Sequence, residues 1–217
     1  MTLQVDVQWV DVIVNQKKTN MIKTILFGMD PGKDGFITAW DGKGFTFYAM
    51  PTHKVDTGEV LKSGKPKMKT EFHISGLVDI IKQIHLDFKG CKLKVAIEEV
   101  GGRGGWSATN NFNFGHTAGL QRMIFEMLNA EIIMVRPQKW QSVVRQGYEL
   151  MKVRSSSGKT MVVDSKMMAE HIAVTEYPGI DFRKTERAKK NHDGKMDSFL
   201  ICLYNIRTNK RRIKKIK

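Results

Sequence analysis

The stretch Thr24-Ile25-Leu26-Phe27-Gly28-Met29 runs directly into Asp30-Pro31-Gly32. Its first six residues are nearly all apolar, which is typical of a β-strand buried on both faces. The Asp-Pro-Gly that follows predicts a turn. Residues 35–40 and 45–49 are further strand patterns, separated by the hairpin signal Asp41-Gly42. The sequence therefore predicts three antiparallel strands in succession, with Asp30 at the end of the first.

The rest of the chain alternates between helical and strand patterns. Residues 51–70 hold five lysines with Gly and Pro, which indicates a basic loop, and flexible loops are also predicted at 101–105 and 153–160. Strands are predicted at 93–97 and 132–135. Helices are predicted over 74–88, 114–129, 164–174 and 193–206, with a short one opening at Pro137. These elements describe an α/β domain with a mixed five-stranded sheet and helices on both faces.

The two ends differ in character from this domain, which we place at residues 21–206. In residues 1–20, apolar and polar residues alternate from Leu3 to Trp9, and a polar break follows. Either this N-terminal extension is not native, the natural start being Met21, or it is a strand added to a sheet edge. Residues 207–217 carry seven basic residues in eleven and are expected to form a disordered basic tail that contacts phosphate.

Composition restricts the class of protein. Thirty-six Lys and Arg against twenty-two Asp and Glu leave a net charge of +14, which points to nucleic acid first and an acidic membrane surface second. Cys91 and Cys202 are the only cysteines, too far apart in sequence for a zinc motif, and they suit a reducing cytoplasm. The sequence shows neither an apolar run of about 20 residues nor a signal peptide, so we expect a cytoplasmic protein without a membrane partner.

Carboxylates stand at the ends of predicted elements. Asp30 ends one strand, Glu98-Glu99 end another, and Asp193 and Asp197 lie four apart on one face of the last helix. Taken singly, each has an ordinary interpretation: a turn, a solvated strand end, a helix cap. Together they supply the oxygen ligands that a pair of Mg²⁺ or Mn²⁺ ions uses in phosphodiester hydrolysis.

The ordered set of motifs resembles a known family. Gly28-Met29-Asp30-Pro31-Gly32, Ala96-Ile97-Glu98-Glu99-Val100 and His192-Asp193-Gly194-Lys195-Met196-Asp197-Ser198 are similar to the three acidic motifs of RuvC-type Holliday junction resolvases. Asn113-Phe114-Gly115 and Arg136-Pro137-Gln138-Lys139-Trp140-Gln141 look most like the RuvC-like endonucleases of bacteriophages. The resemblance spans about residues 24–205.

This resemblance implies an RNase H-like fold and a homodimer that makes paired nicks across a four-way DNA junction. It implies two Mg²⁺ ions, with Mn²⁺ as a substitute, held by Asp30, Glu98, Asp193 and Asp197. Many cellular members space the closing acids three apart, but that position is Gly194 here. Either Asp193 or His192 would therefore complete the metal site. A phage-encoded enzyme would act in the host cytoplasm.

Four residues are predicted to contact DNA. Arg103 and Trp106 lie in the glycine-rich loop where the family carries a loop that enters the junction, and Lys166 falls where it places a DNA-contacting lysine. Lys139 belongs to the 136–141 motif. The ordinary interpretations stay open: a mobile loop whose Trp packs back on the protein, and a solvated helix face for Lys166.

Other functions stay open beside junction resolution. The same fold supports structure-selective, flap or RNA nucleases and non-catalytic nucleic-acid-binding modules. An actin-like sugar kinase or ATPase also begins with an acidic strand turn, but it needs a second phosphate loop and a larger chain. Ser155–Thr160 resembles the end of a phosphate-binding loop, yet Val153 stands where its first glycine belongs, so we expect no nucleotide cofactor.

Overall fold

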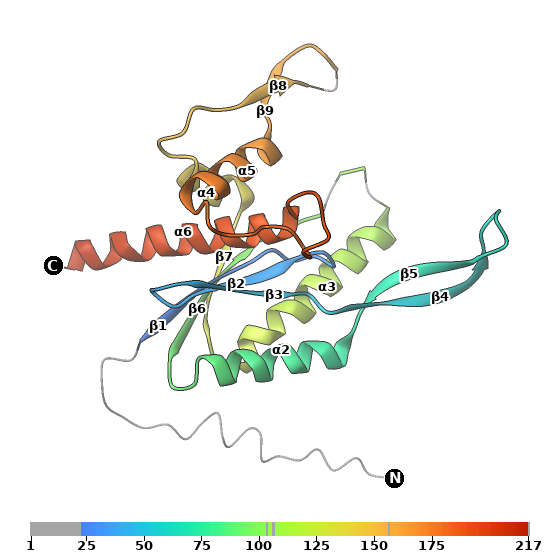
Figure 1. Ribbon diagram of the computed structural model, residues 1–217, viewed down its shortest axis with the longest axis horizontal. Helices are drawn as coiled ribbons and strands as arrows, with labels where there is room; N and C mark the ends of the chain where they lie inside the picture. Colours follow the sequence, from blue (N-terminus) through green and yellow to red (C-terminus); the bar gives the residue numbers. More distant parts are fainter. Residues whose placement is uncertain (1–22, 103, 106, 156, 217) are drawn as a thin grey trace, which may run out of the picture.

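The strand β1 (Thr24–Met29) lies in the middle of a five-stranded sheet, and all but its first residue are buried. It pairs antiparallel with β2 (Phe36–Trp40), which pairs antiparallel with β3 (Phe45–Ala49). On its other side β1 pairs parallel with β6 (Lys92–Glu98), and β6 pairs parallel with β7 (Glu131–Val135). The order β3-β2-β1-β6-β7 is the mixed five-stranded sheet that the sequence predicted (Figure 1).

The computed structural model describes residues 23–102, 104–105, 107–155 and 157–216, with side chains to residue 209. The candidate N-terminal strand and the loop residues Arg103 and Trp106 lie outside these ranges. None of the helices within them has both the length and the apolar character that crossing a membrane requires.

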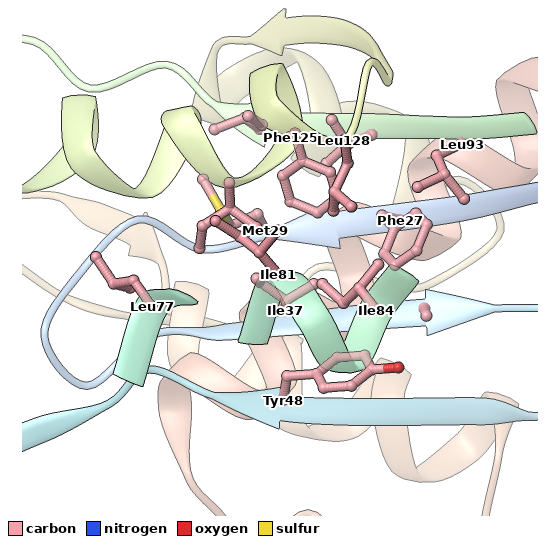
Figure 2. Close-up of a cluster of buried hydrophobic side chains, with 14 of the residues drawn as sticks. Phe27, Met29, Ile37, Tyr48, Leu77, Ile81, Ile84, Leu93, Phe125 and Leu128 are labelled. Carbon is pink, nitrogen blue, oxygen red and sulfur yellow. The ribbon is translucent and has the colours of Figure 1, made fainter. Parts of the chain in front are cut away.

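Helices cover both faces of the sheet. On one face lie α2 (Ile74–Asp87) and α3 (Ala108–Met127), and Figure 2 shows Phe27 and Met29 of β1 among side chains from both. On the other face lie α4 (Pro137–Val144), α5 (Ser165–Glu176) and α6 (Asp193–Ile216), whose apolar residues form a second buried cluster. The predicted class, with helices on both faces of a mixed sheet, is confirmed.

The helix α6 lies unusually close to β1. A Cβ built on Gly28 would stand 2.0 Å from the backbone nitrogen of Cys202, so only glycine permits this contact. Buried Asn205 donates from Nδ2 to the carbonyl oxygens of Phe27 and Lys94, at 3.0 Å each. These bonds tie the helix to two neighbouring strands and fix where its first turn lies.

Several boundaries differ from the sequence predictions. Residues 51–70 are not a loop but most of a hairpin, β4 (Thr52–Val60) with β5 (Pro66–Phe72), and the 153–160 segment is flanked by the short strands β8 (Lys152–Arg154) and β9 (Met161–Val163). Both hairpins are largely exposed on their two faces, so neither shows the apolar alternation that reveals a strand. The helix α3 begins at Ala108 because the Ser107 side chain caps it, and α6 continues from 206 through the basic segment to Ile216.

Candidate active site

Two of the predicted acids meet at one edge of the sheet. Because β1 and β6 are parallel neighbours with Met29 opposite Ile97, Asp30 and Glu98 come next to each other where these strands end. The first turn of α6 reaches the same edge, since Oδ2 of Asp30 lies 3.0 Å from the point where a Cβ of residue 194 would stand. The structure therefore brings Asp30, Glu98, Asp193 and Asp197 to one end of the molecule.

Gly194 explains the spacing of the two acids on α6. A Cβ at this position would lie 2.4 Å from the carbonyl oxygen of Asp34 in the turn after β1, a contact that real Cβ atoms do not make. A carboxylate at 194 therefore does not fit against this turn. The acid stands one residue earlier, at Asp193, four residues before Asp197 and one helical turn away.

The electrostatics of Asp197 show that the acids interact. Burial, followed by the charges of Glu98 and Asp193, raises the pKa of this half-buried carboxyl from 3.8 to about 7. Only the cation of Lys166 acts in the opposite direction among the causes. An ionised Asp197 is therefore costly in the bare protein, and a nearby cation would relieve that cost.

Lys166 lies where the sequence predicted, beside the acidic cluster. Asp164 caps α5 by accepting from the backbone nitrogens of Lys166 and Met167, which places Lys166 in the first turn of the helix. Its Nζ lies 2.5 Å from Oδ2 of Asp193, and both side chains are exposed. This bond raises the pKa of Lys166, so the lysine stays charged at the mouth of the site.

Trp140 is a site residue to which the sequence assigned no role. Its indole Nε1 donates to Oε2 of Glu98 at 2.8 Å, and the ring is buried, with 3% of its surface exposed. Pro137 begins α4 and sets Trp140 one turn into the helix, facing the end of β6. The 136–141 motif contained this tryptophan, but a contact between positions 42 residues apart has no local sequence signal.

His192 is engaged in the fold. Its ring packs edge-on against Phe36, with centroids 5.1 Å apart, and its Nδ1 accepts from the backbone nitrogen of Lys195. Its carbonyl oxygen accepts from Lys195 and Met196, so His192 caps α6. Burial, followed by the charge of Lys184, lowers its pKa. The capping role that the sequence left open for Asp193 thus belongs to His192, and Asp193 is the better candidate for the site.

The remaining candidates lie around the cluster. Glu99 is exposed, with Oε2 3.6 Å from Nε of Arg136. Lys139 is exposed on α4 next to Trp140. A pocket of about 100 Å³ lies between α4, α5 and α6, and its lining includes Trp140, Lys166, Asp193 and Asp197.

The four acidic side chains offer the kind of ligand atoms that a hard divalent cation binds. All four acids offer carboxylate oxygens, which Mg²⁺ and Mn²⁺ prefer. In the described ranges, however, no three His, Cys, Asp or Glu side chains are close enough to form a ready-made metal site. Lys166 bonds one carboxylate and Trp140 another, so the acids lie near one another without converging on a single point.

Comparison with known proteins gives similarity of fold only. No protein-family model matches the chain, and no curated protein matches it significantly. Among solved structures, Thermus thermophilus RuvC in complex with a Holliday junction substrate is 10% identical, with a TM-score of 0.46 over 86% of this chain and 96% of that one. Thermus thermophilus RuvC in a second structure is 13% identical, with a TM-score of 0.43 over 85% and 96%. The yeast mitochondrial Holliday junction resolvase Ydc2 is 12% identical, with a TM-score of 0.41 over 91% and 83%.

Proposed function

We propose that this chain is a metal-dependent endonuclease that resolves four-way and related branched DNA junctions. The observation that carries the proposal is the meeting of Asp30, Glu98, Asp193 and Asp197 at one sheet edge, where two strand ends adjoin the first turn of α6. Four carboxylates from three separate segments are costly to gather at one place unless they bind cations, because they repel one another and lose water. The raised pKa of Asp197 supports this interpretation.

In this proposal the four acids hold a pair of Mg²⁺ ions. Such ions activate water and stabilise the leaving oxygen in phosphodiester hydrolysis. Trp140 positions Glu98 through its indole hydrogen bond, and Lys166 presents a charged ammonium at the exposed side of the site, where a DNA phosphate would lie. Lys139, exposed on α4, is proposed as a further phosphate contact, together with Arg103 and Trp106 from the adjoining loop.

The substrate implies a homodimer. A four-way junction has approximate two-fold symmetry, and its resolution requires one cut on each of two opposed strands. Two copies of this chain related by a two-fold axis would supply two equivalent sites. A single chain holds one such cluster in its described part, so mass measurement with and without junction should show a dimer.

The test is a cleavage assay with matched substrates. The protein is incubated in Mg²⁺ with a four-way junction, a linear duplex, a flap, an RNA hairpin and ATP. Symmetric nicks in the junction that are absent from the linear duplex support the proposal. Binding without cleavage would favour the non-catalytic module, and consumption of ATP would favour the kinase class. Cleavage that persists in Asp30→Asn or Glu98→Gln would refute the proposed site.

A further inference from the structure

The hairpin formed by β4 and β5 projects away from the sheet and its helices (Figure 1). Its strands pair only with each other, in a separate two-stranded sheet. An isolated pair of strands is marginally stable in water, so ordering this one needs support. At its root, Nζ of Lys33 donates to the carbonyl oxygen of Thr70 at 2.9 Å and Phe72 is buried. The hairpin is thus anchored to the turn that follows Asp30.

The charge of the hairpin is concentrated at its tip. Residues 52–72 contain five lysines and three acidic residues, a surplus of two positive charges. Glu59 pairs with Lys67 at 2.7 Å and Glu71 pairs with Lys69 at 2.6 Å, so the charges of these two lysines are neutralised by neighbours in the hairpin. Lys62 and Lys65 are exposed in the turn itself, which is closed by a hydrogen bond from the backbone nitrogen of Leu61 to the carbonyl oxygen of Lys65. The surplus therefore lies at the end farthest from the body.

The dimensions and surface of the hairpin suit duplex DNA. A two-stranded ribbon fits the major groove, and β4, with nine residues, is about 30 Å long. The lysines at the tip adjoin exposed Val60, Leu61 and Met68, a mixed surface that can contact both phosphate and apolar base or sugar edges. A pocket of about 240 Å³ lies at the root of the hairpin, and its mixed polar and apolar lining includes Lys33, Lys69 and Glu71.

We propose that the β4–β5 hairpin is a DNA-binding arm, which grips one duplex arm of the substrate through Lys62 and Lys65, away from the site of cleavage. The inference rests on the proposed action on DNA. Its physical basis is the surplus of cations at the tip of a projecting hairpin that is anchored through Lys33 to the turn that follows Asp30. The arm would set the position of the duplex relative to the acidic cluster without taking part in the chemistry.

The test compares the salt dependence of binding in Mg²⁺-free buffer. The slope of log K against log salt is negative, and each lysine lost from a phosphate contact reduces its magnitude by about 0.9. Lys62→Gln with Lys65→Gln should therefore reduce the magnitude of the slope by about 1.8, and Lys→Arg at both positions should restore it. The matched control is Lys43→Gln with Lys89→Gln, two exposed lysines at the opposite end of the sheet, which should change the slope little. An unchanged melting temperature checks that the variants are folded.

A second measurement locates the contact. At about 3.4 Å per base pair, an arm of about 30 Å covers about nine base pairs. The double variant should lose affinity on junctions with long duplex arms and lose little on junctions whose arms are cut to about six base pairs, too short to extend under the hairpin. An equal loss of affinity on the long-armed and the short-armed junctions would contradict the proposal that the hairpin binds DNA away from the branch point.

The outcomes separate this inference from the proposed function. If the slope in the tip variant equals that of the control, the arm proposal is wrong, and the lysines only protect exposed strand edges from aggregation. If the tip variant shows the predicted change in slope but the wild-type chain never cleaves DNA, the nuclease proposal fails and the arm proposal stands. If the wild-type chain cleaves junctions but the slope of the tip variant is unchanged, the nuclease proposal stands and the arm proposal fails.

Discussion

Replacing Asp197 by Asn should stabilise the metal-free protein while it abolishes cleavage. The carboxyl of Asp197 is half-buried at the end of the sheet, and this burial, followed by the charges of Glu98 and Asp193, raises its pKa. In the unfolded chain these neighbours are absent, and the group ionises near its ordinary pKa of 3.8. The folded state therefore bears a cost for the ionised carboxylate that asparagine, of nearly the same shape, does not carry.

The magnitude follows from the pKa of about 7 in the folded protein. A difference of about three between folded and unfolded pKa values corresponds to about 4 kcal/mol. Because water reaches part of the side chain and screens the repulsion, we expect about 2 kcal/mol. The folded pKa lies above the unfolded one, so the folded state binds the proton more tightly. The free energy of unfolding then falls as the pH rises from about 4 to about 7, and the full cost is present above about pH 7.

The assay is thermal or denaturant unfolding in EDTA at about pH 8 and at about pH 5. At the higher pH, Asp197→Asn should melt about 4–8 °C above the wild type, and the gain should shrink as the pH falls. Asp79→Asn, on the exposed side of α2 across the sheet, is the matched control and should change stability by less than about 0.5 kcal/mol. Added Mg²⁺ should stabilise the wild type more than Asp197→Asn. Equal stability of variant and wild type at the higher pH would refute the crowding of carboxylates and, with it, the argument for a cation site.

Four other outcomes are expected. Glu98→Gln should abolish cleavage and leave junction binding intact, whereas Glu99→Gln, whose side chain lies by Arg136, should cleave nearly normally; single-turnover rates and gel shifts measure both. Trp140→Phe keeps the buried ring but removes the bond to Glu98, so the Mg²⁺ concentration for half-maximal cleavage should rise about tenfold, and an unchanged value would contradict a positioning role. Gly194→Ala forces the first turn of α6 away from the Asp34 carbonyl, and cleavage should fall about 100-fold in the same assay. A chain that begins at Met21 should fold, dimerise and cleave normally, and loss of the dimer in light scattering would make the first twenty residues part of the fold.

The sheet could be predicted because its strands obey simple rules. Residues 25–29 carry no polar side chain because helices cover both faces of the sheet, and the Asp41-Gly42 turn joins the two strands of a hairpin. The β4–β5 hairpin escaped prediction for the opposite reason. Neither of its faces packs along its length on the body, so its residues carry no apolar period, and its lysines and glycines are typical of a loop.

The candidate acids could be picked out from the sequence, but their contacts could not. The acids stand at strand ends and on one helix face, positions that periodicity reveals. The choice between Asp193 and His192 depended on the Asp34 carbonyl and on the ring of Phe36, which belong to segments more than 150 positions away in the chain. Contacts between segments so far apart leave no periodic pattern in the sequence, so the sequence could not favour Asp193 over His192.

The bare cluster is tolerated because the protein offsets part of its charge. Lys166 pairs with Asp193, and the Trp140 indole donates to Glu98, so two carboxylates have partners that come from α5 and α4. The pKa of Asp197 is nevertheless raised, first by burial and then by the charges of Glu98 and Asp193. A cation bound among the acids would compete with the ammonium for Asp193 and free Lys166 to face a phosphate. Lys166→Ala should therefore strengthen Mg²⁺ binding in calorimetry while it weakens junction binding, a pair of opposite effects that a lysine on an ordinary solvated face would not produce.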